Sequence, residues 1–176
     1  MLRNISIQNL WILNIIFMLV WHILCFVACV YINTKYFDWN RKMYQMKKWE
    51  KNGKWYVSHL AIKKWKDLLP QHVGKDGFSK EHFTGKSIKY IDDFILETCR
   101  GEWDHSMCCI YGIIALAINP LWLGLIFLFA TLIINLPFIA IQRYNRIRLQ
   151  ILRKRLLREE LRNVTVDKNK NEGEVV

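Results

Sequence analysis

A long apolar stretch, Met107–Ile141, constrains the fold of this chain more than any other feature. Its 35 residues contain no Lys, Arg, Asp, Glu or His. About 20 apolar residues let an α-helix cross the hydrocarbon core of a bilayer, so this stretch is long enough for two crossings. Asn119 and Pro120 stand near its middle, where the chain would have to turn. The sequence therefore predicts a transmembrane helical hairpin, which we place at residues 103–142.

A second apolar run, Leu10–Ile32, lies near the start of the chain and predicts an N-terminal transmembrane anchor within residues 1–32. Cleavage of this run as a signal peptide is the alternative. The first arm of the hairpin, Trp103–Ile118, has 16 residues and is short for a crossing, so a re-entrant arm is also open. The predicted fold class is an all-α integral membrane protein with about three transmembrane helices.

The distribution of positive charge predicts the orientation of these spans. Arg3 is the only Lys or Arg before the first span, whereas residues 33–106 carry 15 and the chain from Arg143 onward carries 10. Because Lys and Arg near span ends favour the cytoplasmic side, we expect an external N-terminus and a cytoplasmic central segment. The remaining predicted regions are an interfacial helical, loop-containing cytoplasmic segment (33–102), with a surface helix at Trp39–Lys51, a basic cytoplasmic helix (143–162) and a disordered tail (163–176).

The formal net charge of +11 is explained either by membrane anchoring or by a patch for anionic lipid heads or phosphorylated ligands. Nucleic acid is not a predicted partner, because the interleaved aromatic residues lack the spacing of a stacking motif. The five cysteines form no CxxC pair. His22, Cys25 and Cys29 share one helical face but have no fourth ligand, so no metal is predicted.

Three polar clusters meet on one membrane face if this topology holds. His105 continues a helical stripe with Glu97 and Gly101, and a histidine beside a carboxylate is the simplest general base. We therefore predict His105 as the base, with Glu97 or Glu102 orienting it; an ordinary interfacial histidine is the alternative. The residues predicted to bind substrate are Arg100, Lys64, Trp65, Lys66, Asn135, Arg143, Tyr144, Asn145, Arg146 and Arg148. The arginines and lysines among them suit phosphate or a developing oxyanion.

Several short strings of the chain resemble the bacterial glycosyl-4,4'-diaponeurosporenoate acyltransferases. The resemblance runs from about Glu50 to Arg155, with Ser106, Gly101 and Ile147 departing from the expected pattern. The matching strings are Lys64-Trp65-Lys66-Asp67-Leu68-Leu69-Pro70, Gly77-Phe78-Ser79-Lys80 with His82, Glu97-Thr98-Cys99-Arg100-Gly101-Glu102 with His105, Asn135-Leu136-Pro137, and Gln142-Arg143-Tyr144-Asn145-Arg146-Ile147-Arg148.

This resemblance implies a multi-pass enzyme of the bacterial cell membrane that esterifies the sugar of a glycosylated carotenoid acid with a fatty acyl group. An acyl-CoA or similar thioester would be the co-substrate, and no cofactor is implied. The expected partners are membrane lipid, a lipid-soluble glycosylated acceptor and the fatty acyl donor, which would meet on the cytoplasmic face. A related glycolipid is the alternative acceptor. The competing hypothesis is a noncatalytic membrane scaffold that binds anionic lipid and a partner enzyme.

Overall fold

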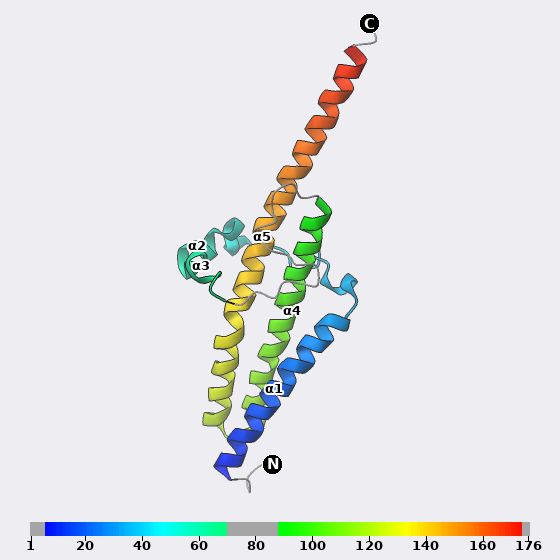
Figure 1. The fold of residues 1–176 in the computed structure, drawn as a ribbon. Coiled ribbons are helices and arrows are strands. Elements are labelled where there is room, and N and C mark those ends of the chain that lie inside the picture. Colours follow the sequence, from blue (N-terminus) through cyan, green and yellow to red (C-terminus); the bar gives the residue numbers. More distant parts are fainter. Residues whose placement is uncertain (1–5, 70–87, 174–176) are drawn as a thin grey trace. The chain divides into compact units, whose positions relative to one another are not determined.

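The computed structural model describes residues 6–69 and 88–173, and the elements in these ranges are helical (Figure 1). This confirms the prediction of an all-α chain. In order along the chain the elements are α1 (Ile7–Tyr31), the 3-10 helices η1 (Thr34–Phe37) and η2 (Lys48–Gly53), α2 (Lys54–Leu60), α3 (Ile62–Trp65), α4 (Ile88–Ile118) and α5 (Leu121–Gly173).

The chain forms two compact units, and both long helices α4 and α5 contribute to each. The first unit comprises Met1–Gln45 and Thr98–Arg143, and the second comprises Met46–Glu97 and Tyr144–Val176. The first unit therefore contains α1 with the later part of α4 and the first part of α5. The second contains η2, α2 and α3 with the remaining parts of α4 and α5.

A small apolar core joins the helices of the first unit. Leu10 of α1 is buried with Tyr111 and Ala115 of α4 and with Leu123 and Phe127 of α5. The side chains of Trp11, Met18 and Trp21 pack against this core. The indole of Trp21 also donates a hydrogen bond to the carbonyl oxygen of Met107 at 3.0 Å, so α1 and α4 are joined by polar as well as apolar contacts.

A reciprocal pair of asparagines joins α1 to the turn of the hairpin. The Nδ2 of Asn14 donates to Oδ1 of Asn119 at 2.9 Å, and Nδ2 of Asn119 donates back to Oδ1 of Asn14 at 2.8 Å. The hydroxyl of Tyr111 adds a bond to the carbonyl oxygen of Asn14 at 2.7 Å. Because such polar side chains hydrogen-bond across helices where little water is available, this pair fixes the position of α1 on the hairpin.

The predicted turn at Asn119 and Pro120 is confirmed, since it separates α4 from α5. Among the residues that the structure describes, two helices are long and apolar enough to cross a membrane, α1 and the Leu121–Asn163 part of α5. The third predicted crossing falls on α4, which continues without a break from Ile88 into the hairpin. That crossing stays a prediction.

Two glycines allow the hairpin helices to approach closely. A Cβ atom on Gly124 would lie 2.7 Å from the Cα of Leu116, and one on Gly112 would lie 3.0 Å from the Cα of Leu128. Because the opposing atoms belong to the backbone, a side chain at either glycine would push the two helices apart.

Gly124→Val is therefore expected to lower the stability of the purified full-length protein by about 1–3 kcal/mol, the usual cost of overpacking. Thermal unfolding in detergent measures the loss. Ala117→Val is the matched control, because Ala117 is exposed on α4. Equal melting temperatures for the two variants would contradict the close packing.

The segment after α1 differs from its prediction. The surface helix predicted for Trp39–Lys51 is wrong, because bends and turns precede the short η2. The Asp38 carboxylate accepts a hydrogen bond from the backbone N–H of Asn40 at 2.9 Å, which favours a turn over a helix. Gly53 has a φ of +83° and ends η2 directly before α2 begins at Lys54.

Helix α5 continues to Gly173, whereas a disordered tail was predicted from Asn163. No proline or glycine interrupts residues 163–172, and the Lys and Glu residues among them favour helix. The Gly77–Lys80 string and His82, part of the family resemblance, lie outside the described residues.

Candidate functional site

Three helices of the first unit bring two histidines together through one asparagine. On α4, Nδ1 of His105 lies 3.0 Å from Oδ1 of Asn135 on α5. The Nδ2 of Asn135 lies 3.3 Å from Nε2 of His22 on α1. The ring of Phe138 stacks on the His105 imidazole, with centroids 4.6 Å apart and planes inclined by 12°. The prediction of a functional histidine at His105 therefore corresponds to a side chain held in a defined orientation.

The hydrogen bonds around Asn135 determine where the protons lie. Its Nδ2 donates to the carbonyl oxygen of Thr131 at 2.9 Å, so Oδ1 is the atom that faces His105. An amide oxygen only accepts, and therefore Nδ1 of His105 carries a proton. On His22, Nδ1 donates to the carbonyl oxygen of Met18 at 2.7 Å, which leaves Nε2 to accept from Asn135. The assignment leaves Nε2 of His105 as a basic nitrogen with no bonding partner among the described residues.

Asp104 adds negative charge beside the two histidines. Its carboxylate interacts electrostatically with both His105 and His22. Its Oδ1 is buried and has no hydrogen-bond partner among the described residues. The predicted role of Glu97 or Glu102 in orienting His105 stays a prediction, and the structure adds Asp104 as a further acid that interacts with the imidazoles. The sequence could have pointed to Asp104 because this residue directly precedes His105. It could have pointed to His22 because this histidine stands alone within an apolar run.

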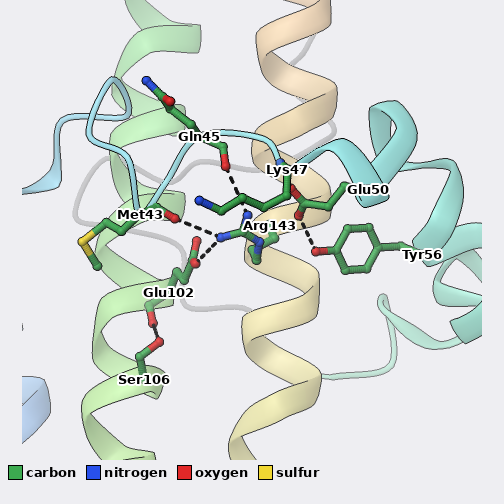
Figure 2. Close-up of polar contacts among 8 residues, drawn as sticks. All are labelled: Met43, Gln45, Lys47, Glu50, Tyr56, Glu102, Ser106 and Arg143. Atoms are coloured by element: carbon green, nitrogen blue, oxygen red, sulfur yellow. Dashed lines mark hydrogen bonds and ion pairs between the residues drawn. The ribbon is translucent and has the colours of Figure 1, made fainter.

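Glu102 instead forms a buried ion pair with Arg143. The Nη1 of Arg143 donates to Oε1 of Glu102 at 2.7 Å, and the two side chains are 12% and 10% exposed (Figure 2). The same guanidinium donates to the carbonyl oxygens of Met43 at 3.2 Å and Gln45 at 3.3 Å. Arg143 therefore holds the segment after η1 against α4 and α5 of the first unit.

Other predicted residues are also engaged with the protein itself. The guanidinium of Arg100 lies 5.4 Å from the ring centre of Phe37. Arg146 is 1% exposed, and Tyr144 is buried with its ring against that of Tyr56. Asn145 is half-buried. These contacts support structural roles for residues that the sequence assigned to substrate.

The second unit contains another buried carboxylate. Glu50 accepts a hydrogen bond from the hydroxyl of Tyr56 at 2.6 Å and another from the backbone N–H of Lys47 (Figure 2). Nearby in the chain, the indole of Trp65 donates to the carbonyl oxygen of Leu60 at 2.7 Å, and Lys66 pairs with Asp67 at 2.7 Å. Lys64, by contrast, is exposed.

Basic side chains line two adjoining cavities of the second unit, which share Asn52, Ile151 and Arg155. One measures about 330 Å³ and the other about 550 Å³. Arg148, a predicted substrate-binding residue, lines the smaller one. Arg153 is directed elsewhere, since its guanidinium donates a hydrogen bond to Asp92 at 3.1 Å. This bond raises the pKa of the guanidinium. We call the two cavities together the basic groove.

No group of three or more His, Cys, Asp or Glu side chains suited to a metal ion occurs in the described part of the chain. The arrangement around His105 instead suits proton transfer. It combines a basic nitrogen, a fixed tautomer and a carboxylate, and it lies in a unit built from apolar helices of membrane-spanning length. These features describe a helical protein with a side-chain arrangement that suits acid–base chemistry.

Comparison with known proteins identifies the chemistry. The family model described as glycosyl-4,4'-diaponeurosporenoate acyltransferase matches residues 40–155. A relative of that name from Staphylococcus aureus strain MRSA252 is 33% identical over 125 residues, which cover 69% of this chain and 75% of the relative. The relative from strain bovine RF122 / ET3-1 is 32% identical over the same shares. No solved structure matches. The chain belongs to the glycosyl-4,4'-diaponeurosporenoate acyltransferase family, and it is an acyltransferase.

Proposed function

We propose that this protein is a membrane-embedded O-acyltransferase that esterifies a sugar hydroxyl of a glycosylated carotenoid, or of a related glycolipid, with a fatty acyl group. The observation that carries this proposal is the Nε2 of His105, which has no bonding partner within residues 6–69 and 88–163 and belongs to an imidazole whose tautomer Asn135 fixes. The relatives are named for acyl transfer to glycosyl-4,4'-diaponeurosporenoate, an acceptor with a sugar hydroxyl.

The outer surface of α1 supports insertion in a membrane. In its most apolar stretch, only 17% of the residues are buried within the protein. Phe17 and Ile23 are 63% and 61% exposed. Water disfavours such a continuous apolar face, whereas lipid accepts it. We propose that α1, residues 103–118 of α4 and the first part of α5 cross the bilayer. The charge distribution favours a cytoplasmic location for residues 33–102 and 143–162.

Acyl transfer needs a base, an acid and a leaving group, and one imidazole can serve at both proton steps. The Nε2 of His105 accepts the proton of the acceptor hydroxyl, and the hydroxyl oxygen attacks the thioester carbonyl carbon. When the tetrahedral intermediate collapses, the carbon–sulfur bond breaks and His105 returns the proton to the departing thiolate. Asn135 is a positioning residue in this scheme. The charge of Asp104 stabilises the transient imidazolium.

Lipid extracts of a pigment-producing host test the proposal. Deletion of the gene is expected to remove the acylated glycosyl carotenoid and to cause accumulation of its unacylated form, as measured by mass spectrometry. Reintroduction of the wild-type gene should restore the product. An unchanged extract would contradict the proposal, and accumulation of a different unacylated glycolipid would identify another acceptor. If the deletion removes the product and the His105→Ala gene restores it fully, the result would favour the hypothesis of a noncatalytic scaffold.

A further inference from the structure

The basic groove defined above has a marked imbalance of charge. Among the described residues, its smaller cavity is lined by four cationic side chains and no carboxylate, and the larger one adds three cations and a single carboxylate, Glu159. The seven cationic residues are Lys54, Lys63, Arg148, Lys154, Arg155, Arg158 and Arg162. A concave surface lined by one sign of charge concentrates ligands of the opposite sign.

Three cations of the groove have no acidic partner among the described residues, unlike two basic residues of α5 that lie outside the groove. Arg143 is paired with Glu102, and Arg153 is paired with Asp92. Within residues 6–69 and 88–163, by contrast, no ion pair is formed by Lys54, Lys63 or Arg155. Cationic side chains that line a cavity without forming ion pairs are available for an anionic ligand.

The floor of the groove is partly apolar. Val57, Ile151 and Leu152 lie among the cations of the smaller cavity. At about 330 Å³ that cavity has the size of a small-molecule site. A bare phosphate would leave the apolar floor without a contact, whereas phosphates joined to an organic group would use both kinds of surface.

We propose that the basic groove binds the phosphate-bearing end of the acyl donor, a coenzyme A thioester. This assignment of the donor rests on the proposed function. The groove has cations for both the diphosphate and the 3'-phosphate, and its apolar floor contacts the nucleoside. Anionic phospholipid heads share the phosphate chemistry and are the source that the experiment must distinguish.

The test measures binding of free coenzyme A to the full-length protein in nanodiscs of neutral phosphatidylcholine by isothermal titration calorimetry. The double variant Lys63→Gln/Arg155→Gln is expected to bind coenzyme A at least about tenfold more weakly, because two charge-assisted hydrogen bonds are lost. Dephospho-coenzyme A should bind the wild type more weakly than coenzyme A. The matched control is Lys48→Gln/Lys89→Gln, which removes the same charge at exposed positions outside the groove and should bind normally.

Equal affinities for the groove and control variants would overturn the proposal. So would a result in which the groove variant keeps coenzyme A affinity but loses binding to vesicles that contain phosphatidylglycerol, because the groove would then be a lipid site. Calorimetry reads binding without turnover, so it separates the two proposals. The groove variant could lose coenzyme A affinity while deletion of the gene leaves the lipid extracts unchanged. That combination would refute the proposed acyl transfer and would still support the groove as a coenzyme A site.

Discussion

His105→Ala is expected to lower the rate of acyl transfer by about 100- to 10,000-fold, the usual contribution of a positioned general base. The physical reason is the loss of the Nε2 nitrogen that Asn135 and Phe138 orient. Initial rates are measured with purified protein in detergent, an acyl-CoA donor and the unacylated glycosyl carotenoid, and the ester is quantified by mass spectrometry.

The matched control is His59→Ala, which removes an exposed histidine of the second unit. Its rate should stay within about twofold of the wild type, since surface substitutions have small effects. Asn135→Leu should retain some activity but alter the pH profile, because the proton on Nδ1 of His105 is no longer fixed. Near-normal turnover by the His105→Ala protein would refute the assigned base.

Hydrophobic patterning predicted most of the helical architecture. The apolar run before Ile32 became α1, and the run around Asn119 and Pro120 became the α4–α5 hairpin. These predictions succeed because a long apolar segment must satisfy its backbone hydrogen bonds internally, and a helix does so without distant partners. The positions of the apolar residues along the chain were therefore sufficient to predict these helices.

The segment between α1 and α2 was not predictable in the same way. Its aromatic and basic composition suits an interfacial helix, but Lys51 and Asn52 adopt left-handed conformations. The buried Glu50 organises this region through Tyr56 and the backbone of Lys47. Side chains that bond to nearby backbone groups compete with helix, and composition does not show which of them do so.

The candidate site was only half predictable for a related reason. Spacing on a single helix identified His105, because a histidine and its stripe are local features. Asn135, which lies on another helix, bonds to Nδ1 of His105, and Asp104 interacts electrostatically with the same imidazole. The carboxylate of Glu102 bonds to Arg143. A single sequence carries no direct record of contacts between distant segments, so it did not point to Asn135 and Asp104 as neighbours of His105, and the roles of Glu97 and Glu102 stay predictions.

Arg143→Met is expected to destabilise the protein by about 3–5 kcal/mol, because it leaves the Glu102 carboxylate buried without its partner. Chemical unfolding of the full-length protein in mixed micelles measures the change. The double variant Glu102→Gln/Arg143→Met should recover much of the loss, since no unpaired charge remains. Arg41→Met is the matched control. That arginine is exposed and lies over the ring of Tyr36, so a loss below about 1 kcal/mol is expected.

The same variants decide between two roles for Arg143. The sequence argument assigned this arginine to a ligand, whereas the geometry gives it to Glu102 and to the carbonyl groups of Met43 and Gln45. If the geometry is right, the double variant regains stability and acyl transfer together, because the arginine acts through the fold. Normal stability of Arg143→Met combined with a raised KM for the acyl donor would contradict that account and return Arg143 to the substrate.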